Sequence, residues 1–143
     1  MSRHRIVGLA LAALLIAAPR LSAQYVVVVN PRNPVDRLTP TQVSKIFLGK
    51  LLAWSIDGKV QPVLPVDQPS DSPVRAVFSQ RVLHKSVSET EAYWRQELYA
   101  GRNVPPPEQS EAEALATVRT DIGAIAYVSS KADLKGVKIV QVN

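Results

Sequence analysis

The sequence of 143 residues contains no cysteine and only two histidines, His4 and His84. The lack of cysteine excludes disulfide bonds, thiolate metal sites and cysteine nucleophiles together. One histidine beyond the first few residues cannot form a conventional zinc site, and no serine lies in the G-x-S-x-G turn of hydrolases. We therefore expect no catalytic residue, no metal and no cofactor, and a structural or surface role for His84 near a helix end.

The chain carries little excess charge once its first 23 residues are set aside. It has 17 basic and 12 acidic residues, but Arg3, Arg5 and Arg20 belong to this N-terminal stretch, which contains no acidic residue. The rest of the chain therefore has a net charge of only +2. Because no basic run interleaved with aromatic residues remains, we expect no nucleic-acid partner.

The N-terminal stretch has the three parts of a secretory signal. A basic "MSRHR" precedes the apolar run "IVGLALAALLIAA", and "PRLSAQ" offers a cleavage site after Ala23. The apolar run is shorter than the roughly 20 residues that cross a bilayer. We expect residues 1–23 to be a cleaved signal peptide and the protein to be periplasmic. An uncleaved N-terminal anchor stays open, since Leu21 is not the ideal residue three positions before the cut.

Apolar segments predict four strands in the remaining chain. The β-branched run "YVVVV" (Tyr25–Val29) is typical of a strand buried on both faces, and a proline-containing loop follows it. The segment "VQPVLPV" (Val60–Val66) predicts an edge or irregular strand because it contains two prolines. "GAIAYV" (Gly123–Val128) predicts a third strand, and "VKIVQV" (Val137–Val142) alternates like a half-exposed fourth.

Capping signals place four helices between these strands. Three of the helix starts match the S/T-x-x-E/Q capping box. The helix that begins at Thr39 is predicted to end at Gly49, and the one that begins at Ser88 is predicted to end at Gly101. The four predicted N-cap residues are Thr39, Ser72, Ser88 and Ser110.

These elements predict one α/β domain over residues 24–143, in which helices flank a small mixed sheet. "GRNVPPPEQ", between the last two helices, is too rich in proline for either element, and we expect a surface loop there.

The stretch "VDQPSDSPVRAVF" (Val66–Phe78) is the best site candidate. A strand, a small polar loop and a helix N-terminus present free N–H groups and the positive end of a helix dipole to an anion. Ser70 and Ser72 add hydroxyl groups, and Arg75 can fold back as a bidentate partner for phosphate or carboxylate. The alternative is a capped helix without a ligand, in which Arg75 pairs with Asp71.

Polar residues after the first strand form a second candidate. Asn30, Arg32 and Asn33 follow Tyr25–Val29, where ligands of open α/β sheets tend to bind. If the two loops are neighbours, Arg32 meets the same anion as Arg75. We therefore include Asn30 and Arg32 among the predicted ligand-binding residues.

Two motifs give the chain a resemblance to a known family. "LTPTQVSKIFLGKLLAW" resembles the "IFLGK" segment of phosphate-binding periplasmic proteins of ABC transporters, and "IGAIAYV" resembles the later "PGAIGYV" of the same proteins. The resemblance covers about Tyr25 to Val142. It implies the type II periplasmic binding fold, of which this chain is similar to the second lobe only.

The phosphate loop departs from the pattern of that family. In the family loop "R-x-D-G-S-G-T", only the serine carries over, at Ser72, while Asp71 and Pro73 stand at the glycine positions and Val74 at the threonine. Glycines let backbone approach an anion closely, and that freedom is lost here. A single lobe also leaves an anion half solvated. The resemblance therefore implies weak binding.

We arrive at three functional hypotheses. The first is a non-enzymatic periplasmic lobe that binds phosphate or a related oxyanion weakly and delivers or reports it to a membrane transporter or sensor. The alternative is a protein-interaction module that kept the fold and lost the ligand, with Trp54 or Trp94 on its partner surface unless they pack in the core. An envelope hydrolase requires His84 to lie beside a serine and a carboxylate.

Overall fold

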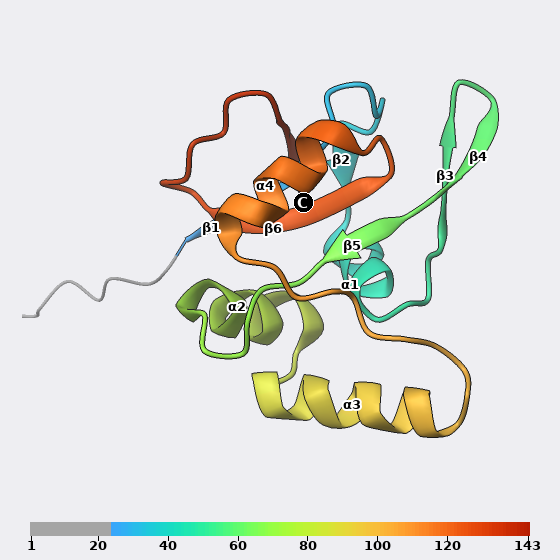
Figure 1. The fold of residues 1–143 in the computed structure, drawn as a ribbon, viewed down its shortest axis with the longest axis vertical. Coiled ribbons are helices and arrows are strands. Elements are labelled where there is room, and N and C mark those ends of the chain that lie inside the picture. Colours follow the sequence, from blue (N-terminus) through green and yellow to red (C-terminus); the bar gives the residue numbers. More distant parts are fainter. Residues whose placement is uncertain (1–23) are drawn as a thin grey trace, which may run out of the picture.

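The computed structural model describes residues 24–143, and the predicted signal peptide lies outside the described residues. A mixed sheet of five strands has the order β2-β7-β1-β6-β5, and a separate hairpin pairs β3 with β4 (Figure 1). Within the described part of the chain, no helix is both long and apolar enough to cross a membrane. The strands are β1 (Tyr25–Val29), β2 (Arg37–Leu38), β3 (Ala53–Ile56), β4 (Lys59–Pro62), β5 (Leu64–Val66), β6 (Ala124–Ser129) and β7 (Lys138–Val142).

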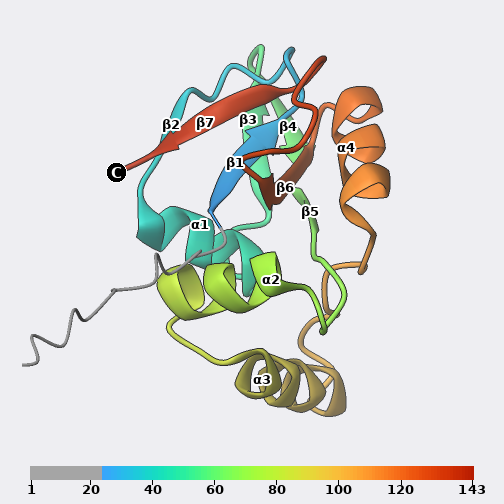
Figure 2. The same ribbon diagram turned by 90° about the vertical axis from the view of Figure 1, so that its left-hand side faces the viewer.

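Helices cover both faces of this sheet. Figure 2 shows α4 alone on one side, with α1 and α2 together on the other and α3 beyond α2. A π-helical segment, η1, continues α2 directly. The helical segments are α1 (Pro40–Phe47), α2 (Pro73–Phe78), η1 (Ser79–Leu83), α3 (Val87–Tyr99) and α4 (Glu111–Thr120).

The central strand β1 is buried on both faces, as its unbroken run of valines predicts. Val27 and Val29 pack into the cluster formed with α1, α2 and η1, and Val28 packs into the cluster formed with α4. Neighbouring residues of a strand point to opposite faces, so one strand contributes to both cores. β1 is antiparallel to β6, and β5 is parallel to β6. The predicted small mixed sheet flanked by helices is confirmed.

Four aromatic rings form the centre of the larger core. The rings of Phe78 and Tyr127 are stacked, with centroids 3.8 Å apart and an interplanar angle of 8°. Phe47 meets both rings edge-on, and Tyr25 meets Phe78 in the same way. These contacts join α1, α2, β1 and β6.

Glycines of the two family-like motifs stand where a side chain does not fit. Gly49 follows α1 with a φ of +69°, and a Cβ there would lie 2.1 Å from Nδ2 of Asn103. A Cβ on Gly123 would lie 2.3 Å from the carbonyl oxygen of Pro62. The carbonyl of Gly123 accepts hydrogen bonds from Nε1 of Trp54 and from the backbone of Leu64, which anchors the hairpin.

The predicted strand Val60–Val66 is wrong in its extent. β4 ends at Pro62 in the hairpin, whereas β5 begins at Leu64 in the main sheet, where it is an edge strand as predicted. The hairpin strand β3 and the short β2 were not predicted. Asp57 and Gly58, with φ values of 51° and 73°, form the turn between β3 and β4, as a two-residue hairpin requires.

The predicted helix start at Ser88 is also wrong. Ser86 is the N-cap of α3, and its hydroxyl accepts a hydrogen bond from the N–H of Glu89. The same capping pattern therefore occurs two residues earlier, and Ser88 lies in the first turn. The other N-caps at Thr39, Ser72 and Ser110 are confirmed, and Thr39 forms a complete capping box.

We predict that Phe78→Ala lowers the free energy of unfolding by about 3–5 kcal/mol, because it removes a fully buried ring from the aromatic centre. Urea unfolding measures this loss. Tyr99→Ala is the matched control, since Tyr99 is 97% exposed and its removal changes stability by about 0.5 kcal/mol or less. Equal losses in the two variants would contradict this description of the core.

Candidate functional site

The loop between β5 and α2 is closed by its own hydrogen bonds. Ser72 has extended backbone angles, and its hydroxyl oxygen accepts from the N–H of Arg75 at 3.1 Å. The same hydroxyl donates to Oε1 of Gln68 at 2.5 Å. Pro73 has no N–H, so the first three residues of α2 leave only the N–H of Val74 to an external anion. Ser72 therefore acts as a cap whose own proton is already used.

Arg75 lies buried beneath this loop, with 2% of its surface exposed. Its Nη1 donates to the carbonyl of Gln68 at 2.8 Å and to Oε1 of Glu108 at 2.6 Å. Its Nε is 3.5 Å from Oδ1 of Asp67 but makes no hydrogen bond within the described residues. The guanidinium is thus paired with two carboxylates and retains an unused donor.

Asp67 directly follows β5 and connects Arg75 to the aromatic core. The hydroxyl of Tyr127 and the N–H of Gln68 both donate to its Oδ1. Burial raises the pKa of Asp67, while the hydrogen bond from Tyr127 and the charge of Arg75 oppose this shift without cancelling it. Burial, with the charge of Asp67, also raises the pKa of Tyr127, so the phenol stays protonated and donates.

Arg75 stays charged in this environment. Burial acts to lower its pKa, but the charge of Asp67 and the hydrogen bond to Glu108 outweigh burial and raise the pKa above its ordinary value. A buried cation is stable only when it is paired in this way. The three side chains therefore form one ionic cluster, which we call the Arg75 cluster: Arg75, Asp67 and Glu108.

A pocket of about 250 Å³ borders the Arg75 cluster on the side of α3. Besides the three members of the cluster, Glu91 and Arg95 line this pocket, so two cations face three carboxylates. Trp94, Leu98, Pro105 and Pro106 supply its apolar wall. The carboxylates of this pocket therefore outnumber its cations, and an anion that enters it meets an excess of negative charge.

The structure brings together three of the five predicted ligand-binding residues. Ser70, Ser72 and Arg75 share the loop and first turn of α2, with Ser70 exposed and Arg75 buried. The predicted alternative partner of Arg75, Asp71, is exposed, while Asp67 and Glu108 hold the guanidinium. Ser72 therefore caps the helix start as expected, but the ionic partners of Arg75 are Asp67 and Glu108 instead of Asp71.

Asn30 and Arg32 lie at the other end of the sheet. β1 runs antiparallel to β6 and ends beside Ile125, at the start of β6, whereas β5 runs parallel to β6 toward its end. Asn30 is buried, and its Nδ2 donates to the carbonyls of Val118 and Arg119 at the end of α4. The two loops are not neighbours, so the condition for Arg32 to share an anion with Arg75 is not met.

The sequence analysis did not predict Glu108 as a member of the Arg75 cluster, nor Gln68 and Tyr127 as its hydrogen-bond partners. The sequence does offer a signal for Asp67, which is a carboxylate directly after a predicted strand. Glu108 lies in the proline-rich loop, 33 residues beyond Arg75, and no local pattern connects the two. This loop reaches the sheet because Asp67 and Glu108 form a β-bridge, in which the N–H of Gln109 donates to the carbonyl of Asp67.

His84 and the two tryptophans occupy ordinary structural positions. His84 is exposed with a φ of 53° at the end of η1, and the pocket that it borders has Ser44 but no carboxylate among its lining residues. The condition for a hydrolase is therefore not met there. Trp54 packs in the larger core, whereas Trp94 is buried on α3 and lines two pockets, so neither side chain is exposed on a partner surface. Residues 24–143 contain no group of three or more His, Asp or Glu residues arranged to hold a metal ion.

Residues 17–142 match the sequence profile of the PBP superfamily domain. The fold is similar to an ABC-type phosphate transport receptor from Vibrio cholerae, with 22% identity and a TM-score of 0.65. It is also similar to a phosphate ABC transporter substrate-binding protein from Clostridium perfringens with bound phosphate, with 23% identity and a TM-score of 0.64. A third similar structure is PstS from Borrelia burgdorferi, with 19% identity and a TM-score of 0.63. A search of curated protein sequences finds no match.

These similarities extend over most of this chain but less than half of the other proteins. They cover 84% of this chain and 46% of the Vibrio cholerae receptor, 84% and 45% for the Clostridium perfringens protein, and 85% and 47% for PstS. The fold thus corresponds to a single lobe of these proteins, which confirms the expected fold class.

We predict that Asp67→Asn gains stability relative to the wild type as pH rises. A raised pKa means that the folded protein binds this proton more tightly than the unfolded chain, whose ordinary value is near 3.8. Between pH 3.8 and the raised pKa of the folded state, Asp67 ionises in the unfolded chain but stays protonated in the folded protein. This difference lowers the free energy of unfolding of the wild type as pH rises, and the asparagine variant lacks this loss.

Urea unfolding of both proteins over the acid-to-neutral range measures this difference. An asparagine oxygen still accepts from Tyr127 and Gln68, so the comparison isolates the charge. A difference that instead shifts toward the wild type with rising pH would show that pairing with Arg75 outweighs the burial of Asp67.

Proposed function

We propose that this chain, which belongs to the PBP superfamily domain family, is a non-enzymatic solute-binding lobe that binds phosphate or a related oxyanion weakly at the start of α2. The observation that carries this proposal is the position of Arg75. A protonated guanidinium is buried directly beneath a helix start, and its Nε has no hydrogen-bond partner among the described residues. Charge-assisted bonds from arginine are the usual means of holding a phosphate group.

Binding at this position is an exchange of anions. The carboxylate of Glu108 accepts from Nη1 of Arg75 at 2.6 Å, and its side chain is half exposed. Asp67 is buried and held by Tyr127, so it stays in place. An incoming oxyanion therefore displaces Glu108 rather than Asp67, and the exposed position of Glu108 lets it move into solvent.

The same exchange keeps the affinity low. The oxyanion replaces a contact that already exists, so only the difference between two anion contacts contributes to binding. The pocket beside Arg75 carries an excess of carboxylates, which repels an anion until Glu108 leaves. The hydroxyl of Ser72 donates to Gln68 and contributes no bond to the oxyanion until that hydrogen bond breaks. Ser70 is exposed, and its hydroxyl can donate to the oxyanion directly.

We place this lobe in the periplasm, where it delivers or reports its ligand to a membrane transporter or sensor. The signal-like residues 1–23 support this location. The similar proteins support the partner class, since two of them are named as a phosphate transport receptor and an ABC transporter substrate-binding protein.

An interaction module without a small ligand is the second candidate. The observation that favours it is the internal pairing of Arg75, whose charge needs no external partner. Several large apolar side chains are also exposed, including Val60 at 80% and Tyr99 at 97%. Under this reading, Glu108 is a permanent partner of Arg75 and anions have no specific effect.

We predict that Glu108→Gln raises the affinity for phosphate about fivefold, because it removes the competing negative charge while keeping a side chain of the same shape. Calorimetric titration with phosphate at low and physiological salt measures the effect. Glu113→Gln is the matched control: it removes the same charge from an exposed position in the first turn of α4 and leaves the affinity unchanged.

Arg75→Ala provides the complementary test. It abolishes phosphate binding if the variant retains its fold by circular dichroism. The site assignment fails if Arg75→Ala binds phosphate as well as the wild type, or if Glu108→Gln binds it more weakly. No saturable heat in the wild type and in Glu108→Gln would favour the interaction module.

A further inference from the structure

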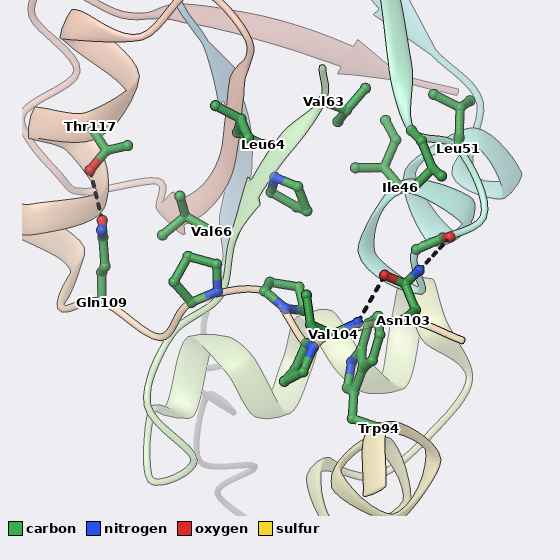
Figure 3. Close-up of a pocket in the computed structure, with 16 residues that line it drawn as sticks. Ile46, Leu51, Val63, Leu64, Val66, Trp94, Asn103, Val104, Gln109 and Thr117 are labelled. Atoms are coloured by element: carbon green, nitrogen blue, oxygen red, sulfur yellow. Dashed lines mark hydrogen bonds between the residues drawn. The ribbon is translucent and has the colours of Figure 1, made fainter. Parts of the chain in front are cut away.

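A second hollow lies on the other side of the proline-rich loop. It is a cavity of about 340 Å³ between β5, the segment that follows α1, and residues 103–107 (Figure 3). Figure 3 shows Val63 and Leu64 on one side of this space and Val104 with Trp94 on another. We call it the apolar cavity. Its size falls within the range of about 300–1,000 Å³ typical of small-molecule sites.

The lining of the apolar cavity contains no charged side chain. Two of its polar side chains are already paired: Asn103 donates to the carbonyl of Gly49 at 2.8 Å, and Thr117 donates to Gln109 at 2.8 Å. Both bonds are drawn in Figure 3. The indole Nε1 of Trp94 is the exception, since it is buried and has no hydrogen-bond partner among the described residues. A charged ligand would lose its hydration there without gaining an opposite charge, which disfavours it.

The backbone around the apolar cavity is equally poor in donors. Pro65 and the three consecutive prolines Pro105, Pro106 and Pro107 line it, and proline has no N–H group. The cavity therefore disfavours a phosphate or a carboxylate, for which the single free indole N–H of Trp94 cannot replace the lost hydration. Proline rings and the indole of Trp94 instead offer flat apolar faces, against which ring systems pack well.

The mouth of the apolar cavity exposes large apolar side chains. Leu52 is 64% exposed, Val104 is 68% exposed and Leu64 is 40% exposed, and all three belong to its lining. Exposed apolar groups gathered around a concave site are typical of a binding surface. A ligand in the cavity covers them and gains the free energy of removing them from water.

We infer that the apolar cavity binds a small neutral molecule built of apolar rings. The size of the cavity, the lack of charged side chains, the scarcity of free backbone donors, and the rings of Trp94 and the prolines in its lining all point to this ligand class. The site goes beyond the proposed oxyanion function and is separate from the Arg75 cluster. Trp94, Pro105 and Pro106 line both hollows and stand between them.

N-phenyl-1-naphthylamine is a suitable probe because it is neutral, ring-shaped and fluorescent in apolar surroundings. We predict that the protein binds it saturably at one site. Leu52→Arg and Val104→Arg, which place a charge at the mouth, each weaken binding at least tenfold. Val60→Arg is the matched control, since Val60 is 80% exposed and does not line the cavity, and it leaves the affinity unchanged.

The test separates this inference from the oxyanion proposal. Glu108→Gln acts on the Arg75 cluster and leaves the probe affinity unchanged, because Glu108 does not line the apolar cavity. Thermal unfolding checks that all variants remain folded. A wild type that does not bind the probe saturably, or equal affinities in the Leu52, Val104 and Val60 variants, would overturn the inference.

Discussion

The burial of one positive charge organises the part of this lobe that faces α3. Arg75 has only 2% of its surface exposed, and an unpaired cation at that depth would cost several kcal/mol. Asp67, directly after β5, and Glu108 from the proline-rich loop supply the opposite charge. The β-bridge between Asp67 and Glu108 then ties this loop to the edge of the sheet. The positions of β5, α2 and the loop are thus linked through a single guanidinium.

This pairing also determines what the lobe can bind. The Arg75 cluster has the components of an oxyanion receptor, but its own carboxylates occupy them, so a ligand has to compete with Glu108. The proline-rich loop carries that competitor on one side and lines an uncharged cavity on the other. One loop of this fold therefore separates an ionic region from an apolar one, and the two favour ligands of opposite chemistry.

Local patterns in the sequence predict much of the fold. The valine run of β1, the serine and threonine caps of three helices and the glycines of the two motifs each act within a few residues. The hairpin carries a local signal as well, Asp57-Gly58 between two segments of alternating apolar and polar residues. The misplaced start of α3 reflects two overlapping capping patterns, of which the earlier one, at Ser86, is formed.

The site depends on distant residues and was less predictable. Arg75 is three residues before Phe78, so helical spacing places it on the buried face, but its partner Glu108 could not be found from spacing alone. The separation of Arg32 from Arg75 follows from strand directions, since β1 and β5 run in opposite directions relative to β6. Strand direction is a property of the assembled sheet and leaves no mark in the adjacent loops.

The most direct test of the central claim is an NMR titration with phosphate that follows the Nε–H resonance of Arg75. This N–H belongs to the buried guanidinium whose Nη1 donates to Glu108, so its resonance shifts when an anion replaces Glu108 at Nη1. If Arg75 is the receptor, its resonance shifts saturably with phosphate. A resonance that stays unchanged while amides elsewhere shift, or while none shifts, would contradict the claim that this guanidinium binds the ligand.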